Sequence, residues 1–94
     1  MSDYRDWVVS LPCCISGYQG EGVDPHHIKG KAWLTGGSLS KKGSDLTCIP
    51  LVHELHMELH NNGWETFEKK YNMSQLEWMV KTILQAEKDG VIKL

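Results

Sequence analysis

Apolar and polar positions recur with different periods along the chain, and each period predicts an element. Between Tyr4 and Leu11 the apolar residues have helical spacing, which predicts two helical turns that end before Pro12. Val23–Ile28 is typical of a first strand, and the β-prone stretch Leu46–Ile49 is typical of a second strand that pairs with it. Glycines and serines punctuate the segments before and between these strands, so both segments are predicted loops.

A helix with two side-chain stripes is predicted directly after the second strand. Pro50 stands where a helix begins, and the helix is predicted to cover Leu51–Asn61 until Asn62 and Gly63 end it. Leucines at four-residue spacing form its core side, namely Leu51, Leu55 and Leu59. Three histidines form the neighbouring stripe, namely His53, His56 and His60. A row of imidazole rings therefore runs beside the buried side of this helix.

Two further helices are predicted in the last third of the chain. Trp64–Tyr71 is a short helix with Trp64 and Phe67 turned inward. The sequence Ser74-Gln75-Leu76-Glu77 has the pattern of a capping box and opens a longer helix to about Lys88. The apolar stripe of that helix is predicted to contain Leu76, Met79, Val80, Ile83 and Leu84. We expect this third of the chain to supply core residues and assign no chemistry to it.

The order of the predicted elements is strand, long loop, strand and helix, with a short helix before them and a long helix at the end. This order predicts an α+β fold in a single domain over residues 1–94. Its core spans about residues 23–62, and residues 64–94 form a C-terminal helical extension. Because a chain of 94 residues buries a small core, a bound metal would contribute to its stability as well as to its chemistry.

Net charge and cysteine content limit which functions and which cellular compartments are expected for this chain. The formal net charge of −2 argues against a uniformly basic nucleic-acid-binding protein, although it leaves room for a local basic patch. Three cysteines, two of them adjacent, do not make a disulfide framework, which favours a reducing compartment. The sequence has no apolar run of transmembrane length and no signal-peptide pattern. We therefore expect a soluble cytoplasmic protein.

All five histidines lie between Asp24 and His60. His56 and His60 are four residues apart, so on a helix they stack on one face and can share a metal ion. His26 and His27 are adjacent in a predicted strand, where neighbouring side chains point to opposite sides. One of the pair can complete a metal site while the other faces a water molecule. Chance is the alternative explanation, because two histidines at this spacing are a short motif and single histidines on apolar faces are more often core residues. The remaining histidine of the helix is predicted to be exposed.

Lysines gather in the loop between the two predicted strands. The segment Lys29–Ser44 is rich in glycine and serine, and no acidic residue interrupts it before Asp45. Its four lysines are Lys29, Lys31, Lys41 and Lys42. A solvated flexible loop is the simpler interpretation. If the histidines bind a metal, the same lysines become candidates for contacts with phosphate groups.

Five short motifs, in this order, resemble an HNH nuclease. They are Leu11-Pro12-Cys13-Cys14, Gly22-Val23-Asp24-Pro25-His26-His27-Ile28, Ser44-Asp45-Leu46, Ile49-Pro50-Leu51 and Leu55-His56-Met57-Glu58-Leu59-His60. The likeness covers about residues 7–72 and is greatest to small phage-encoded members associated with recombination, which include the RecA-dependent nuclease group. It implies a ββα-metal finger, in which two strands, a loop and a helix hold one divalent ion.

The resemblance implies a role for four histidines and one aspartate. It implies that His26, His56 and His60 bind the metal ion and that His27 is the general base. The middle residue of the family motif is usually Asn, and Asp45 lies nearest to that position here. In the family this residue commonly braces the loop that carries the base, and Asp can do so by accepting hydrogen bonds.

A structural zinc site of many relatives is altered in this sequence. Those relatives carry two pairs of cysteines that flank the finger, and the corresponding positions here are Cys13 with Ser16 and Val52 with Leu55. Three of the four ligands are replaced, two of them by apolar residues suited to a core. We therefore expect no structural zinc held by four cysteines.

The resemblance predicts a metal-dependent DNA endonuclease of phage recombination or DNA processing, acting by nicking or double-strand cleavage. Its cofactor would be one divalent ion, and three imidazoles favour Zn, Ni, Co or Mn over Mg. Its partners would be DNA and a recombinase filament or another phage recombination protein, in the cytoplasm of a bacterial host. Two alternatives remain open. One is a non-catalytic, metal-stabilised nucleic-acid-binding or recombination-accessory module, and the other is a small protein-interaction domain with a chance histidine cluster.

Overall fold

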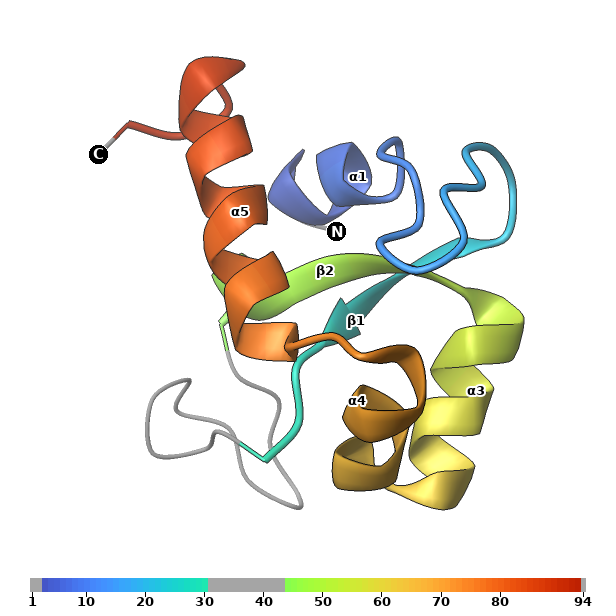
Figure 1. The fold of residues 1–94 in the computed structure, drawn as a ribbon. Coiled ribbons are helices and arrows are strands. Elements are labelled where there is room, and N and C mark those ends of the chain that lie inside the picture. The colour runs from blue at the N-terminus through green and yellow to red at the C-terminus, as the bar shows by residue number, and fades with distance from the viewer. Residues whose placement is uncertain (1–2, 31–43, 94) are drawn as a thin grey trace.

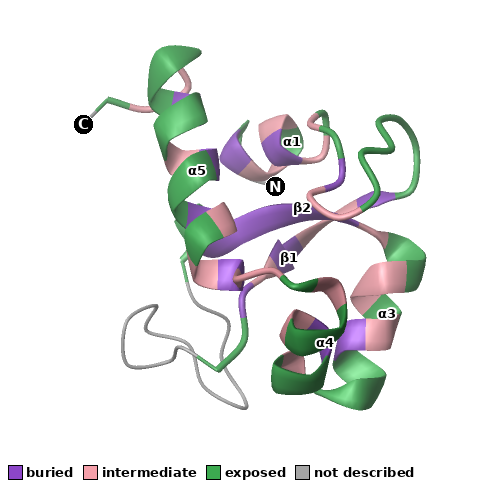
Figure 2. Cartoon of the chain, viewed as in Figure 1, coloured by how far each residue is buried: buried purple, intermediate pink, exposed green. Residues whose placement is uncertain are grey.

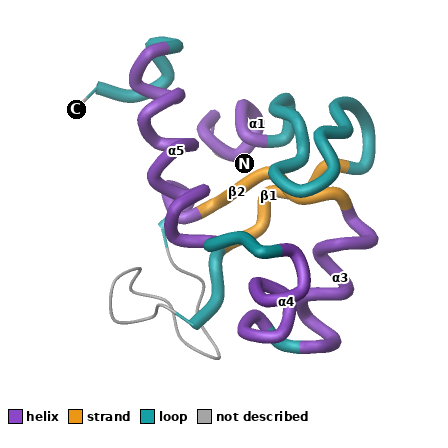
Figure 3. The backbone as a smooth tube through the Cα atoms, viewed as in Figure 1, coloured by secondary structure: helices purple, strands orange, loops and turns teal. Residues whose placement is uncertain are grey.

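The computed structural model describes residues 3–30 and 44–93 (Figure 1). Its elements are α1 (Asp3–Val8), β1 (Val23–His27), the 3-10 helix η1 (Asp45–Thr47), β2 (Cys48–Val52), α3 (His53–Asn62), α4 (Trp64–Tyr71) and α5 (Gln75–Lys88). Figure 3 shows the two strands at the centre with the helices around them. The fold is a mixture of helices and one small sheet, so the predicted α+β class is confirmed. Within the described ranges, every helix is too short or too polar to cross a membrane.

β1 and β2 form an antiparallel sheet of two strands. The register pairs His26 with Ile49 and His27 with Cys48, and successive side chains of a strand point to opposite faces. Figure 2 shows that β2 is buried along most of its length. The predicted first strand is confirmed, because β1 covers all of Val23–Ile28 except the last residue. The sheet therefore sends the two neighbouring histidines to different sides.

The second strand and the helix after it begin later than the sequence predicts. Asp45–Thr47 forms η1, the strand continues through Pro50, and α3 begins only at His53. The prediction of a helix from Leu51 is therefore wrong at its start. Pro50 lies opposite a second proline in the ladder, and its carbonyl points away from β1 to accept a hydrogen bond from Cys14 N–H at 3.0 Å. A proline at such an outward-facing position removes no hydrogen bond from the sheet.

Three groups of buried apolar side chains hold the elements together. The first joins α1, β2 and α5 through Tyr4, Val8, Cys48 and Ala86. The second joins the segment after α1 to β2, α3 and α4 through Cys13, Leu51, Leu59 and Phe67. The third joins the sheet to α5 through Ile28, Ile49 and Met79. The buried Phe67 and the partly buried Trp64 confirm the predicted inward face of α4.

Two predicted helix ends are confirmed. Ser74 Oγ accepts a hydrogen bond from Glu77 N–H at 3.2 Å, which caps the start of α5. Gly63 follows α3 with a φ of 90°, and its N–H donates to the carbonyl of Leu59 at 2.9 Å. The sharp turn at Gly63 lets α4 begin at once.

The buried face of α5 differs from the predicted apolar stripe. Val80 and Leu84 are 46% and 51% exposed, so their prediction as core residues is wrong. The buried residues are Gln75, Met79, Thr82 and Ala86. Their spacing of four, three and four residues is that of one helical face. A glutamine therefore occupies a fully buried position at the start of this helix.

Candidate functional site

Three histidines come together between β1 and α3. The metal-binding nitrogens of His26, His56 and His60 lie within 4.8 Å of one another. His26 comes from β1, whereas the other two lie on successive turns of α3. The Nε2 atoms of His56 and His60 are 3.0 Å apart. Two imidazole nitrogens bound to one zinc ion at about 2.0–2.1 Å come within roughly 3.3 Å of each other, so this spacing fits a shared ion.

The two ring nitrogens of the fully buried His26 have different surroundings. Nε2 lies 2.8 Å from Gln75 Oε1, whereas Nδ1 has no hydrogen-bond partner among the described residues. Burial is the main cause that lowers the pKa of His26 to about 3, so the ring is neutral. Burial, followed by the charge of His56, also lowers the pKa of His60. A buried lone pair without a partner is costly, and a metal ion bound to it would remove that cost.

Asp24 orients His56 from outside the cluster. Its Oδ2 accepts hydrogen bonds from Nδ1 of His56 and of His53, each at 2.9 Å. Partial burial opposes ionisation, but these two hydrogen bonds outweigh it and hold the pKa of Asp24 below its usual value. Because His56 donates from Nδ1, its Nε2 keeps the lone pair and faces His60. The side chain of His53 is 62% exposed, as the sequence predicts.

His27 forms a pair with Asp45. Its Nε2 lies 3.2 Å from Asp45 Oδ1, and its side chain is 10% exposed. Asp45 begins η1, which leads directly into the strand opposite His27, so the local fold brings the two side chains together. In a neutral ring that donates from Nε2 to a carboxylate, Nδ1 is the nitrogen that accepts a proton.

A cavity of about 280 Å³ is lined by the three histidines of the cluster and also by His27. Its lining consists of Arg5, Asp24, Pro25, His26, His27, Lys29, His56 and His60. Lys29 is the predicted phosphate contact that the structure places here. Arg5 of α1 is a further cation in the lining, and sequence reasoning missed it. The other three predicted contacts, Lys31, Lys41 and Lys42, lie outside the described residues.

Gln75 and Asp24 also support the site, and sequence reasoning missed both. The last third of the chain was expected to carry no chemistry, yet Gln75 at the start of α5 reaches His26. The spacing of Gln75 from Met79 is the signal that places the glutamine on the buried face of α5. Asp24 precedes His26 by two residues in a strand, which places both on the same face of the sheet.

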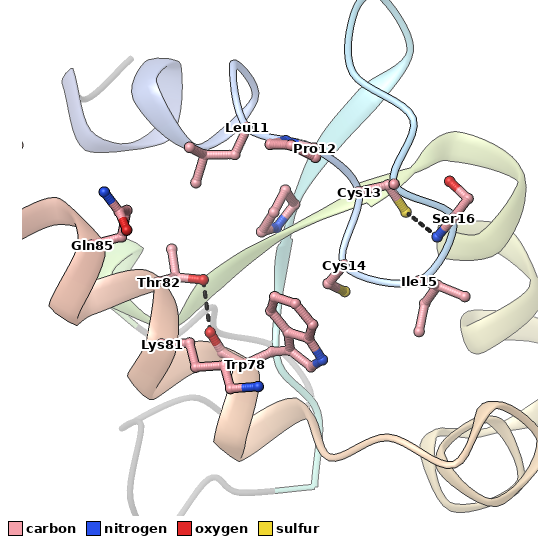
Figure 4. Close-up of a pocket in the computed structure, with 12 residues that line it drawn as sticks. Leu11, Pro12, Cys13, Cys14, Ile15, Ser16, Trp78, Lys81, Thr82 and Gln85 are labelled. Carbon is pink, nitrogen blue, oxygen red and sulfur yellow. Dashed lines mark hydrogen bonds between the residues drawn. The ribbon is translucent and has the colours of Figure 1, made fainter.

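A larger cavity of about 530 Å³ lies apart from the histidines (Figure 4). One side of this cavity is formed by the segment that follows α1, and the other side is formed by α5. Cys13 Sγ accepts hydrogen bonds from the N–H groups of Ser16 and Val52, both at 3.5 Å. Cys13 also packs in an apolar cluster with Val52 and Leu55, two of the positions that the resemblance to HNH nucleases compares with structural zinc ligands. Burial, followed by the charge of Cys13, raises the pKa of the Cys14 thiol to about 12, which keeps it unreactive at neutral pH.

Comparison with known proteins places the chain in a family. Residues 1–90 match the family described as "Protein of unknown function (DUF968)". No curated protein and no solved structure matches the chain. Because the family match covers nearly all of the 94 residues, the chain belongs to the DUF968 family.

Proposed function

We propose that this protein is a metal-dependent DNA endonuclease with the ββα-metal finger of HNH nucleases. The observation that carries the proposal is one cavity lined both by the three-histidine cluster and by His27, the histidine that pairs with Asp45. The order β1, β2, α3 is also the order of elements in that finger. A cluster that served only to hold a structural metal would have no need of a second, differently paired histidine in the same cavity.

The proposed cofactor is one divalent ion held by His26, His56 and His60. The orphaned Nδ1 of His26 and the short contact between the other two rings fit such an ion. Three neutral imidazoles leave coordination positions open, as in catalytic rather than structural zinc sites. When bound, the ion supplies positive charge that polarises a phosphate oxygen and stabilises the leaving oxygen. These ligands favour Zn, Ni or Mn over Mg.

His27 is the proposed general base that takes a proton from the attacking water. Asp45 accepts from Nε2, so the proton from water is taken at Nδ1. The carboxylate then stabilises the imidazolium that forms, as the aspartate of a catalytic triad does. An asparagine at this position would hold the ring but would offer no negative charge. The presence of Asp45 where relatives carry Asn is therefore compatible with hydrolysis.

Arg5 and Lys29 are the proposed contacts to DNA phosphates. Both line the cavity, and a guanidinium can hold two phosphate oxygens at once. Contacts of this kind position a duplex without reading its bases. We therefore propose weak sequence specificity and an affinity for DNA that falls steeply as salt rises. Action in phage recombination, with a recombinase as a partner, is proposed from the resemblance alone.

Cleavage of supercoiled plasmid tests the proposed activity. Wild type, His27→Ala and His53→Ala are compared with EDTA and with Mg, Mn, Ni and Zn. We expect metal-dependent nicking by the wild type and a loss of about 10²–10⁴-fold in His27→Ala, the usual contribution of a general base. His53→Ala is the matched control and should keep most of the activity, because its exposed side chain does not line the cavity.

Each other outcome has a separate meaning. Equal cleavage by wild type and His27→Ala would contradict the assignment of the base. Metal and DNA binding without cleavage by the folded wild type would favour the non-catalytic nucleic-acid-binding or recombination-accessory module. Binding of neither metal nor DNA would leave a protein-interaction domain as the better explanation.

A further inference from the structure

We infer that Gln75 is a positioning residue that selects which nitrogen of His26 binds the metal ion. The inference rests on the metal site of the proposed function. It assigns a role in metal binding to a residue of α5, a helix that is not part of the ββα finger. Its basis is the hydrogen-bond pattern of one buried amide group, together with the two ring nitrogens of His26.

The amide of Gln75 uses all of its hydrogen-bonding positions. Oε1 accepts from Lys29 N–H at 3.1 Å and lies 2.8 Å from Nε2 of His26. The amide nitrogen donates to the carbonyl of Lys29 at 3.3 Å and to Glu68 Oε2 at 3.1 Å. Gln75 is fully buried, so water cannot replace any bond that is lost.

The surroundings of the amide allow only one orientation. In the reversed orientation its NH₂ group would face Lys29 N–H, which is also a donor. Its oxygen would then face the carbonyl of Lys29 and the carboxylate of Glu68, which are both acceptors. Glu68 is itself held in place, because the same Oε2 accepts from the backbone N–H of Gln75 at 3.0 Å.

This orientation sets the tautomer of His26. Because an amide oxygen faces His26 Nε2, that nitrogen carries the proton and donates. Nδ1 then holds the lone pair, and it is the atom without a partner among the described residues. His56 is set in the opposite way, since its Nδ1 donates to Asp24. The cluster therefore offers Nδ1 of His26 together with Nε2 of His56. Nε2 of His60 donates to Nε2 of His56 at 3.0 Å, so it becomes the third ligand when it releases this proton.

Preselection of this tautomer favours metal binding. A ring whose outer nitrogen already carries the proton binds without a change of tautomer, and its hydrogen bond keeps the ring in one orientation. Loss of such an outer partner typically weakens metal affinity about 10–100-fold. The start of α5 therefore helps to build a site whose ligands all lie on β1 and α3.

Nuclear magnetic resonance of the isotope-labelled, metal-free protein tests the inference directly. Two-bond proton–nitrogen correlations distinguish the protonated from the unprotonated nitrogen of each imidazole. We expect the proton of His26 on Nε2 in the wild type. Gln75→Met, which keeps the volume and removes the amide, should lose this preference and bind zinc about 10–100-fold more weakly. Gln85→Met, at an exposed position of the same helix, is the matched control and should change neither quantity.

Gln75→Glu separates the choice of tautomer from a purely structural role. A glutamate offers only acceptors, so His26 should keep its proton on Nε2. The variant loses both donated hydrogen bonds and places a second carboxylate beside Glu68, so its melting temperature should fall. If Gln75→Met does not fold, the tautomers of the wild type and of Gln75→Glu decide the question.

Two results would overturn the inference. One is a wild-type His26 with its proton on Nδ1, and the other is a Gln75→Met variant with unchanged tautomer and zinc affinity. Zinc titration of the labelled wild type should perturb Nδ1 of His26 and Nε2 of His56 and His60. A wild type that binds zinc in this way but cleaves no DNA would overturn the nuclease proposal and leave the inference standing.

Discussion

Hydrogen bonds from distant parts of the chain determine the chemistry of each histidine in the site. The partner of His27 is 18 residues away in sequence, that of His56 is 32 away, and that of His26 is 49 away. The sequence identifies these side chains as possible ligands or bases. It cannot show which nitrogen each ring presents, because that choice depends on partners that only the folded chain brings near.

A single buried tyrosine gives a pH-dependent prediction at the scale of the residue. Burial, followed by the charge of Cys48, raises the pKa of Tyr4 from 10.0 to about 12. The unfolded chain releases this proton at the lower pKa, so the stabilising contribution is fully present below pH 10.0 and is lost as the pH rises towards about 12. Over this range wild type should lose up to about 1.4 kcal/mol per pH unit more than Tyr4→Phe.

Urea denaturation at a series of alkaline pH values measures this difference. The hydroxyl of Tyr4 has no hydrogen-bond partner among the described residues, so Tyr4→Phe should be at least as stable as wild type at neutral pH. Tyr18→Phe controls for the loss of a hydroxyl, because Tyr18 is 50% exposed. Curves for wild type and Tyr4→Phe that stay parallel above pH 10.0 would contradict the raised pKa.

Elements were predictable where the signal is local and less so where it depends on packing. The cap at Ser74, the turn at Gly63 and the helical histidine spacing are local, and the structure contains all three. The start of α3 is different, because Pro50 suits both the beginning of a helix and an outward-facing strand position. The buried face of α5 depends on packing as well, since hydrogen bonds to β1, to Lys29 after it and to α4 compensate the burial of Gln75.

The contact between the segment that follows β1 and the start of α4 gives a prediction at the scale of the element. Gly30 has a φ of 81°, and a Cβ placed there would overlap the indole of Trp64 at the start of α4. Gly30→Ala therefore combines backbone strain with overpacking and should cost about 2–4 kcal/mol of stability. Gly17→Ala is the matched control, because Gly17 has a φ of 76° with open space around it, and it should cost about 1 kcal/mol.

Chemical denaturation of both glycine variants measures these costs. A loss in Gly30→Ala no larger than that in Gly17→Ala would show that α4 moves to make room. In that case the contact between Trp64 and Gly30 would not fix the position of α4. It would then not help to hold Glu68 of α4, or its partner Gln75, beside the histidines.

At the scale of the whole molecule, the histidine cluster is a further connection between elements that the apolar clusters also join. His26 belongs to β1, whereas His56 and His60 belong to α3. The hydrogen bond between Gln75 and His26 connects α5 to this cluster. A 94-residue chain buries a modest core, so an ion that joined the two elements would add an appreciable share of the total stability.

Zinc is therefore expected to stabilise the folded chain against heat. At a free concentration about 100-fold above its dissociation constant, a ligand of the folded state adds about 2.7 kcal/mol. Thermal unfolding with zinc and with EDTA measures the shift. His60→Ala removes one exposed ligand and should abolish most of the shift. His53→Ala should keep the shift, because His53 is not one of the three proposed ligands, although it shares a second possible group with Asp24 and His56.

A shift that survives in His60→Ala would place the ion elsewhere. Among the described residues, two other groups bring their ligand atoms within 4.8 Å of one another, namely Asp24 with His53 and His56, and His27 with Asp45 and Cys48. His53→Ala would then remove the shift if the first group holds the ion, and Cys48→Ser would remove it if the second group does. Both alternative groups differ in charge from the three-histidine cluster. Three neutral imidazoles leave a divalent ion with its full positive charge, which attracts phosphate, whereas the carboxylate of Asp24 would lower that charge and the carboxylate and thiolate of the other group would neutralise it. Loss of the shift in Cys48→Ser would also remove His27 as a base, so this thermal measurement bears on hydrolysis before any DNA is added.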